Sequence, residues 1–370
     1  MKDIVVIGAG ILGASTAYHL AKAGAEVTII DRKDKGQATD AAAGIVCPWI
    51  SQRRNQAWYK LAKAGARYYS ELIPLLEKEG ETNTGYARVG AISLHSDNDK
   101  LQKMIERAIK RREDAPEIGE VRLLTASETK ALFPPVAEMY SSVYISGAAR
   151  VDGRALRESL LQAAKRNGAK MILGSASLEL QGSKVTGVKV DEQVFNAKTV
   201  IVTNGAWAPQ LLEPLGIPLQ VEFQKGQIIH MHLQNADTSN WPVVMPPGSQ
   251  YIVPFNDGKI VAGATNEKDT GFDIRVTAGS VQSILQNALT VAPGLADSTI
   301  VETRVGFRPF TPGFLPVIGA LPDHNNIIVA NGLGSSGLTV APFLGLLIKK
   351  IALKEQINID LESYSIKHAL

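Results

Sequence analysis

The N-terminal part of the chain contains a strand, a glycine-rich turn, a helix and a second strand, in an order that restricts the fold more than any other feature. Residues 4–7 are a β-branched apolar run typical of a strand buried on both faces, and Gly8-Ala9-Gly10-Ile11-Leu12-Gly13 follows it without a gap. Residues 14–23 then show the apolar spacing of a helix, and residues 27–30 form a second buried strand that ends at Asp31. We therefore expect a parallel β-α-β unit.

Each glycine of this turn has its own role in binding a dinucleotide. Gly8 permits the tight turn, Gly10 lets the backbone approach a pyrophosphate, and Gly13 lets the helix pack closely on the strand. The N–H groups and positive dipole end of the helix then face the phosphates. Asp31 stands where an acid accepts a hydrogen bond from a ribose hydroxyl. A carboxylate there argues against the phosphorylated ribose of NADP, but the adjacent Arg32 could bind that phosphate and keeps NADP open. The unit predicts FAD or NAD and does not separate them.

The rest of the chain shows α/β patterns near its ends and strand patterns between them. Buried strands at 199–202 and 327–330 each precede a glycine-containing turn, whereas strands at 220–233, 251–254 and 259–263 suggest an antiparallel sheet. Helices are expected over 56–79, 100–113, 152–167 and 276–292, and further strands over 88–95, 170–173, 176–180 and 184–190. The predicted class is α/β, with a doubly wound Rossmann-like domain and an inserted antiparallel α+β domain.

Composition excludes a disordered, collagen-like, coiled-coil or disulfide-scaffold description of the whole chain. The chain has 370 residues, of which 45% are hydrophobic and 20% charged, as is ordinary for a soluble globular protein. Its 39 basic and 36 acidic residues leave a net charge of +3, too small and too scattered to predict a nucleic-acid partner. No stretch is expected to reach the ~18 apolar residues of a membrane span, and Asp3 with the glycine pattern opposes a signal peptide after Lys2. The single cysteine, Cys47, fits a cytoplasmic location.

No metal site is predicted. The six histidines show no convincing ligand spacing, and His230 and His232 share a strand face without nearby cysteines. Cys47 is interpreted as a buried, inert thiol.

Five segments spread over nearly the whole chain resemble the D-amino-acid oxidase family of flavoproteins, which includes glycine oxidases, sarcosine oxidases and D-amino-acid dehydrogenases. They are residues 4–31, 39–44, 200–207, 306–319 and 332–339, and the fourth, with Gly306-Phe307-Arg308-Pro309, is the most specific. The resemblance implies non-covalently bound FAD. It implies a discontinuous FAD domain and a substrate domain inserted twice, with limits that we set at residues 1–85, 145–220 and 300–370 for the former and 86–144 and 221–299 for the latter.

The resemblance also implies which residues contact the cofactor. The small-residue loop at 39–44 would lie beside the pyrophosphate and flavin, and the turn at 334–337 would direct N–H groups at the flavin. Beyond the N-terminal turn, Asp31 and Arg32, the implied contacts are Thr39, Ala42, Ala43, Gly44, Ile45, Ser177, Thr203, Asn204, Gly205, Trp207, Arg308, Gly334, Ser335, Ser336, Gly337, Leu338 and Thr339. Asp40 replaces a common serine, and it is expected to point away from phosphate or to cap a backbone N–H.

Oxidising an amino acid requires a grip on its carboxylate, which we assign to Arg308, because a guanidinium holds a carboxylate through two parallel N–H bonds. Tyr251 would donate a second hydrogen bond, and Asn266 would face the substrate. Arg304 stands where many relatives have tryptophan and is expected to alter a pocket wall.

The predicted function is FAD-dependent oxidation of a small amino acid of the glycine, sarcosine, D-amino-acid or D-proline type, by hydride transfer from Cα to flavin. The resulting imine hydrolyses in water, and the electrons pass to oxygen or to a respiratory acceptor. Two alternatives stay open, an NAD-dependent dehydrogenase and a non-catalytic flavin-binding protein. The sequence leaves the substrate, the acceptor and the oligomeric state open.

Overall fold

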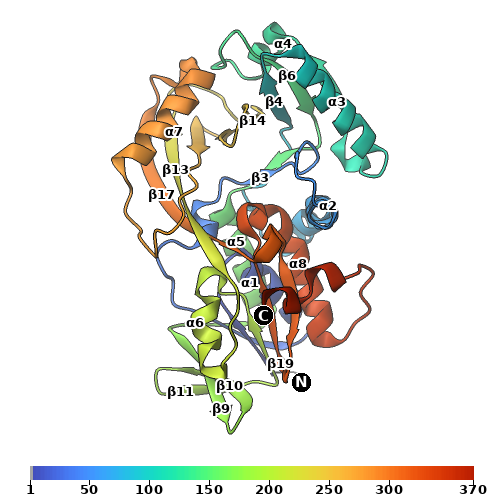
Figure 1. Cartoon of the computed structure of the whole chain (residues 1–370), viewed down its shortest axis with the longest axis vertical. Coiled ribbons are helices and arrows are strands. Elements are labelled where there is room, and N and C mark those ends of the chain that lie inside the picture. The colour runs from blue at the N-terminus through green and yellow to red at the C-terminus, as the bar shows by residue number, and fades with distance from the viewer. Residues whose placement is uncertain (1–2) are drawn as a thin grey trace.

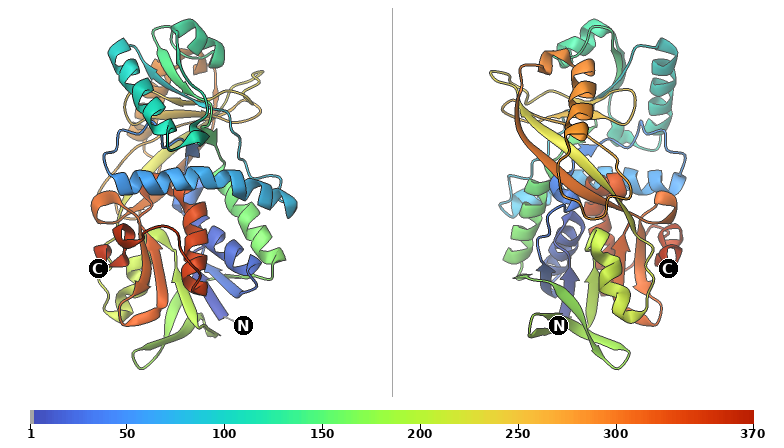
Figure 2. Two further views of the ribbon diagram at one scale, coloured as in Figure 1. Left: turned by 90° about the vertical axis from the view of Figure 1, so that its right-hand side faces the viewer. Right: turned by 60° about the vertical axis from the view of Figure 1, so that its left-hand side comes forward.

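The computed structural model describes residues 3–370, so Lys2, which entered the argument on a signal peptide, lies outside the described residues. The described chain forms an elongated molecule with a sheet in each half, and both ends of the chain lie in the lower half (Figure 1). The α-helices of these residues are α1 (Ile11–Lys22), α2 (Gln56–Lys78), α3 (Asn98–Arg112), α4 (Ala126–Leu132), α5 (Gly153–Arg166), α6 (Ala208–Leu212), α7 (Ala278–Val291) and α8 (Gly337–Leu353). Helix α2 lies across the molecule between the two halves (Figure 2).

The lower half is built on a six-stranded sheet in which β19, β12, β1, β2 and β8 run parallel and β18 runs antiparallel. In spatial order its strands are β18 (Val317–Leu321), β19 (His324–Asn331), β12 (Thr199–Val202), β1 (Asp3–Ile7), β2 (Glu26–Asp31) and β8 (Lys170–Leu173). The predicted β-α-β unit is confirmed as β1, α1 and β2.

Alternate residues of β1 face two separate cores, because side chains on a strand point to opposite faces of the sheet. Ile4 and Val6 pack with α1, α5 and α8, whereas Val5 and Ile7 pack on the opposite face. That second face is covered by α6 and a three-stranded antiparallel sheet of β9 (Ala176–Gln181), β10 (Lys184–Val190) and β11 (Gln193–Asn196). The continuous apolar run of β1 is therefore explained by burial on both faces.

The upper half is built on an eight-stranded sheet that is mostly antiparallel. In spatial order its strands are β17 (Thr299–Phe310), β13 (Glu222–His232), β16 (Lys259–Gly263), β15 (Tyr251–Pro254), β14 (Val243–Met245), β4 (Ala91–His95), β6 (Ser141–Ile145) and β5 (Val121–Leu124). Helix α7 packs against β13 and β16. The predicted strands at 220–233, 251–254 and 259–263 are confirmed as β13, β15 and β16.

Strand β17 was not predicted, and it runs beside β13 from His232↔Thr299 to Glu222↔Phe310. Its sequence contains Gly306 and Pro309, which argue against a strand. Both are tolerated because β17 is an edge strand, so the missing N–H of Pro309 faces no further partner strand. The paired strands β13 and β17 extend from the upper sheet toward the lower half (Figure 2), and our domain limits at 221 and 300 remain a proposal.

One helix corrects the expectation that no segment is long and apolar enough to span a membrane. An 18-residue window within residues 334–353 has a mean hydropathy of 1.5. They pack inside the protein instead, because Val340, Leu344 and Ile348 are buried and α8 contacts α1 and α2. A Cβ added to Gly345 would lie 2.5 Å from Ser15 Oγ, so this glycine permits the close crossing of α8 and α1. The packing identifies α8 as a core helix.

Candidate active site

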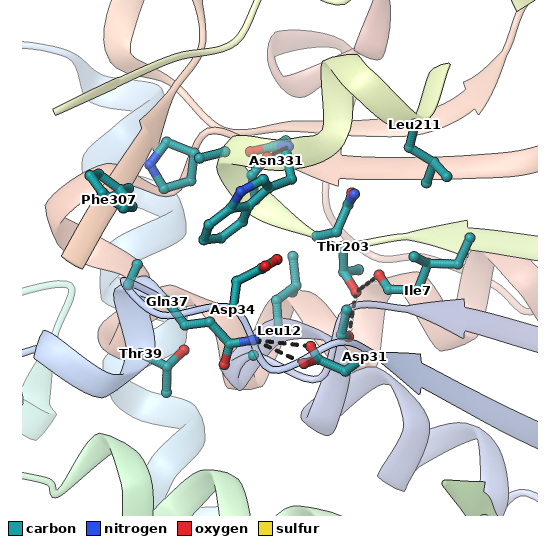
Figure 3. A pocket seen from close by; sticks show the side chains of 18 of the residues that line it. Ile7, Leu12, Asp31, Asp34, Gln37, Thr39, Thr203, Leu211, Phe307 and Asn331 are labelled. Carbon is teal, nitrogen blue, oxygen red and sulfur yellow. Dashed lines mark hydrogen bonds between the residues drawn. The ribbon is translucent and has the colours of Figure 1, made fainter. Parts of the chain in front are cut away.

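A cavity of about 320 Å³ lies at the carboxyl ends of β1, β2, β12 and β19 (Figure 3). The chain leaves β1 toward β2 on one side and later adds β12 on the other, so the strand order reverses at this point. Open α/β sheets bind ligands in such crevices, and the volume matches that of small-molecule sites. The wall includes Gly8, Gly10, Asp31, Asn204 and Trp207.

The glycine turn has the geometry predicted from its spacing. Gly8 has a φ of +96°, and a Cβ on Gly13 would lie 1.8 Å from the Gly8 carbonyl oxygen. A Cβ on Gly10 would meet, among the described residues, only Thr39 Oγ1 at 3.4 Å, so its remaining surface faces the cavity. Thr39 Oγ1 accepts from the Ile11 N–H at 3.0 Å and joins the small-residue loop to the start of α1.

Asp31 lines this cavity and also holds the glycine turn. Its Oδ2 accepts from the Ala9 N–H at 2.7 Å, and its Oδ1 accepts from the Lys33 N–H at 2.6 Å. The same Oδ1 accepts from Gln37 Nε2 at 2.9 Å (Figure 3). The Asp31 residue is 8% exposed. The acid placed at the ribose position is therefore also a structural acceptor, and no sequence signal indicated Gln37.

One buried polar atom of the cavity wall has no protein partner. Asn204 Oδ1 accepts no hydrogen bond from any residue between 3 and 370. An unsatisfied buried acceptor costs free energy, so this oxygen favours a ligand that donates to it.

A second cavity of about 380 Å³ continues from the first, because Ile11, Thr39 and Gly334 line both. The small-residue loop at 41–45 forms one wall, and strands β13, β15 and β17 form another. Apart from its chain neighbours and the backbone of its own helix, no atom of the described chain would lie within 4 Å of a Cβ added to Gly337, so the backbone there is open to a ligand. The two joined cavities, with open backbone at Gly10 and Gly337, fit a long dinucleotide such as FAD.

The second cavity brings together all three predicted substrate residues. Arg308 Nη1 donates to Asn266 Oδ1 at 2.6 Å and to the Thr265 carbonyl at 3.2 Å. Arg308 forms no ion pair within residues 3–370, and its guanidinium lies over Gly226, where a Cβ would be 2.4 Å from Nη2. Burial raises the pKa of the Tyr251 phenol, while the charge and hydrogen bond of Arg308 lower it. Asn266 therefore positions Arg308 in addition to lining the cavity.

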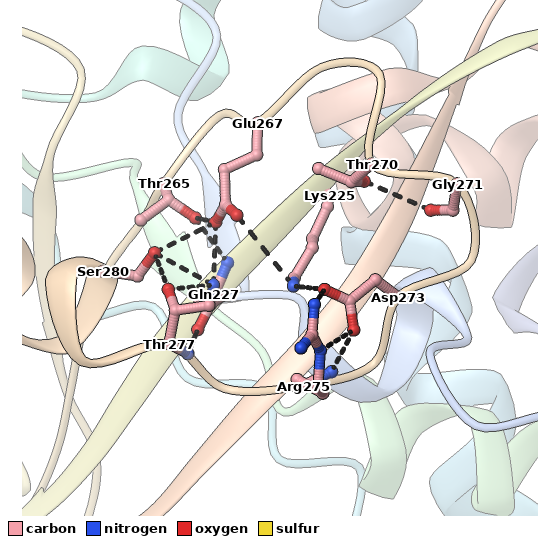
Figure 4. A network of polar contacts seen from close by, with 10 residues as sticks. All are labelled: Lys225, Gln227, Thr265, Glu267, Thr270, Gly271, Asp273, Arg275, Thr277 and Ser280. Atoms are coloured by element: carbon pink, nitrogen blue, oxygen red, sulfur yellow. Dashed lines mark hydrogen bonds and ion pairs between the residues drawn. The ribbon is translucent and has the colours of Figure 1, made fainter.

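A polar network fixes the segment that carries Asn266 (Figure 4). The Lys225 side chain is 1% exposed, and its Nζ lies 3.2 Å from Asp273 and 4.0 Å from Glu267. Gln227 Nε2 donates to Glu267 Oε1 at 2.8 Å. Burial raises the pKa of Glu267, but hydrogen bonds from Thr265 and Gln227 outweigh it and hold that pKa below its usual value. The network therefore favours the ionised form of Glu267 and holds residues 265–277 against β13.

The same segment reaches the first cavity through an aromatic contact. Phe272 stacks on Trp207 with ring centroids 5.1 Å apart and planes 9° apart, and Phe307 meets both rings edge-on. Trp207 and Phe307 line the first cavity. Residues 265–277 therefore contact both cavity walls: Asn266 lines the second cavity, and Phe272 packs on Trp207 of the first.

Several residues that were predicted to contact the cofactor do not line either cavity. Ser177 Oγ donates to the Lys189 carbonyl at 3.4 Å within the β9–β10 pair, and Gly174, Ser175 and Ala176 line the first cavity in its place. The other predicted contacts outside both walls are Ala9, Gly13, Ser336 and Thr339.

Arg304 and Asp40, two residues at which the chain departs from the family pattern, lie outside the walls of both cavities. Arg304 pairs with Glu302 and donates to the Asp40 carbonyl at 3.3 Å, which corrects the expectation that Arg304 forms a pocket wall. The Asp40 carboxylate lies 2.6 Å from Arg157 Nη1 on α5, so it points away from the phosphate position.

The cysteine and histidines lie apart from the cavities. Cys47 is half-buried, and burial raises the pKa of its thiol to about 12. Burial lowers the pKa of His19 to about 3, and its Nε2 lies 3.1 Å from the Tyr68 hydroxyl. Within residues 3–370, no group of three or more His, Cys, Asp or Glu side chains could hold a metal ion.

Comparison with known proteins gives concordant results. A family model described as FAD dependent oxidoreductase matches residues 3–351. The chain is 63% identical over 371 residues to the uncharacterized oxidoreductase YurR of Bacillus subtilis, with 100% of both chains covered. It is 31% identical over 347 residues to a glycine oxidase of Pseudomonas aeruginosa, with 92% of each covered. The crystal structure of iminodiacetate oxidase (IdaA) from Chelativorans sp. BNC1 matches with a TM-score of 0.95 and 47% identity over 98% of each chain.

Proposed function

Since the chain belongs to the FAD dependent oxidoreductase family, we propose that it oxidises a small primary or secondary amino acid at the carbon beside the amine. The observation that carries this proposal is Arg308. Its guanidinium lines the second cavity, no carboxylate of residues 3–370 pairs with it, and Asn266 and Thr265 occupy only part of its fork. The remaining N–H groups suit the carboxylate of an amino acid.

The cofactor supplies the redox chemistry. FAD held in the two cavities would supply a two-electron hydride acceptor; loss of a hydride from the substrate carbon and of a proton from its nitrogen would leave an imine, which water hydrolyses. Oxygen or a respiratory carrier then accepts the electrons. Membership of a family of FAD-dependent oxidoreductases argues against the two alternative functions, an NAD-dependent dehydrogenase and a non-catalytic flavin-binding protein.

The wall of the second cavity favours a substrate that binds as the neutral amine. Within residues 3–370, the lining contains no Asp, Glu, His or Lys side chain that could take a proton from an ammonium group. Arg308 and Tyr251 therefore act by binding and orienting the substrate.

The names of two relatives support the proposal that the substrate is an amine that carries a carboxylate. Glycine oxidase and iminodiacetate oxidase are named for different amines, but each amine carries a carboxylate on the carbon beside nitrogen. We also propose a cytoplasmic location, supported by the core position of α8 and by the single, unpaired Cys47.

The test is anaerobic flavin bleaching with substrate pairs that differ by one carboxylate, followed by admission of air. Sarcosine is matched with dimethylamine, and D-alanine with ethylamine; glycine and D-proline complete the panel. At least one amino acid should bleach the flavin while its decarboxylated partner does not. Equal bleaching by an amino acid and its partner would contradict the proposal. Recolouring in air would identify oxygen as the acceptor.

A further inference from the structure

A second arginine, Arg53, lines the same cavity as Arg308, and we propose that it binds a second anionic group of the substrate. The inference rests on the proposed function, because it assumes that Arg308 holds the first carboxylate. It narrows the substrate class to amines with two anionic arms, such as an amine that carries two carboxymethyl groups.

Arg53 is held in position by neighbours on two other elements. Its Nη2 donates to Ser335 Oγ at 3.0 Å, and its guanidinium lies 4.7 Å from the centroid of the Trp58 ring. Trp58 is itself fixed, because its Nε1 donates to Ser336 Oγ at 2.9 Å. A guanidinium that is stacked on an aromatic ring loses less freedom when it binds an anion.

The segment before Arg53 is anchored as well. Arg111 Nη1 on α3 donates to the carbonyls of Trp49 at 2.5 Å and Ser51 at 2.8 Å, and Ser51 Oγ accepts from the Arg53 N–H at 3.2 Å. Asn55 then caps α2 by accepting from the Trp58 N–H at 2.9 Å. Arg53 is therefore fixed on both sides along the chain.

The charges of this cavity are unbalanced. Arg53 and Arg308 are the charged side chains among its described lining residues, and neither forms an ion pair with residues 3–370. Arg53 is exposed as a residue and its guanidinium sits at the edge of the cavity, where partial burial lowers its pKa. Two guanidinium groups on one cavity repel each other, and a ligand with two negative groups relieves that repulsion.

The contact between Arg53 and Ser335 suggests a second possible role for Arg53, which is to act on the cofactor, because the turn at 334–337 is predicted to face the flavin. An arginine that acts on the cofactor would affect all substrates alike. An arginine that binds the second arm of the substrate would affect dianions selectively. The test therefore depends on ligands that differ by one carboxylate.

The first measurement is ligand binding to the FAD-loaded protein, monitored through the change that each ligand causes in the flavin absorption spectrum. Diglycolate and methoxyacetate contain an ether in place of the amine, so neither is oxidised, and they differ by one carboxylate. Wild type should bind diglycolate more tightly. Arg53→Ala should weaken diglycolate binding about 10- to 100-fold and leave methoxyacetate binding unchanged, since one charge-assisted contact is lost. Arg53→Lys should retain part of the preference.

Arg54→Ala is the matched control, because Arg54 is the adjacent arginine, is exposed as Arg53 is, and lies outside both cavity walls. It should leave the binding of both ligands unchanged. Equal loss of both ligands in Arg53→Ala, or no loss of either, would overturn the inference. A change in sulfite affinity of the flavin with equal effects on both ligands would assign Arg53 to the cofactor instead.

The second measurement separates this inference from the proposed function. Flavin reduction is compared for iminodiacetate and sarcosine, which share a secondary amine and differ by one carboxylate. If sarcosine bleaches the flavin and Arg53→Ala leaves the ratio of the two substrates unchanged, the proposed function stands and the inference fails. If no amino acid bleaches the flavin, the proposed function fails, and diglycolate binding still decides whether Arg53 holds a second anion.

Discussion

The Ala9 N–H donates to Asp31 Oδ2 at 2.7 Å, so the acid at the end of β2 holds the glycine turn that follows β1. Because the same carboxylate lines the first cavity, one side chain both shapes the dinucleotide turn and faces the proposed ribose position. Its loss is expected to act on the protein and on the cofactor together.

We expect Asp31→Ala to weaken FAD retention by ~1.5–3 kcal/mol, because buried charge-assisted hydrogen bonds are lost without replacement. The apoprotein should also unfold at a lower temperature, since the Ala9 and Lys33 N–H groups lose their acceptor. Flavin occupancy after dialysis and thermal unfolding without FAD measure the two effects. Asp34→Ala is the control, because Asp34 lines the same cavity but pairs with Arg32 at a partly exposed site. Unchanged occupancy in Asp31→Ala would contradict the assignment.

Arg308→Ala should cost ~3–5 kcal/mol of transition-state binding, which lowers kcat/KM by a factor of roughly 10² to 10⁴, because the desolvated carboxylate loses its partner. Arg308→Lys should also be poor, since an ammonium cannot make the two-pronged contact. Both variants should stay yellow and folded. Stopped-flow flavin reduction by the best amino acid is the measurement. Near wild-type rates in both variants would make Arg308 structural and would favour a simple amine as substrate.

Lys225→Met should destabilise the protein by ~1–3 kcal/mol, because Glu267 and Asp273 would lose a buried cation but keep partial access to water. Arg275→Ala removes another partner of Asp273, but the Arg275 side chain is 83% exposed, so its effect on stability should be much smaller. Denaturant unfolding compares the variants. Lys225→Met should also change tryptophan fluorescence, because the segment that stacks Phe272 on Trp207 loosens. Equal stability of the two variants would show that the network does not hold this segment.

Stability should fall as the pH drops below about 6.5, because burial lowers the pKa of His19 from 6.5 to about 3. Between these values the unfolded chain binds a proton that the folded protein excludes, so the stabilisation is complete above the unfolded pKa and is lost on acidification. The slope contributed by this group is about 1.4 kcal/mol per pH unit. Denaturant unfolding of wild type and His19→Gln at pH 7.5, 6 and 5 measures it. The variant should show a smaller loss on acidification, and parallel curves would contradict the assignment.

The flavin should be released without breaking a covalent bond. Cys47 lies outside the walls of both cavities, and its thiol pKa of about 12 leaves almost no reactive thiolate. Acid precipitation should leave the yellow colour in the supernatant, and Cys47→Ala should keep full flavin content. Colour that stays in the pellet of the wild type and is lost from that of Cys47→Ala would identify this thiol as an attachment point.

Local pattern was sufficient to predict the β1-α1-β2 unit, the tight turn at Gly8 and the close helix–strand packing at Gly13. Strand burial, helix periodicity and the conformation of a tight turn all depend on residues that are neighbours in the sequence. The same reasoning located β13, β15 and β16, and the resemblance to a known family placed Arg308, Tyr251 and Asn266 in one site.

Tertiary structure alone decided how distant segments share a wall. The β17 strand contains Gly306 and Pro309, so only its pairing with β13 at a sheet edge makes it a strand. Arg53 carries no motif, and it becomes a binding residue because α2 and the turn at 334–337 hold it on the cavity of Arg308. Such contacts join residues far apart in the chain, and their geometry depends on the packing of whole helices and sheets, which no local propensity encodes.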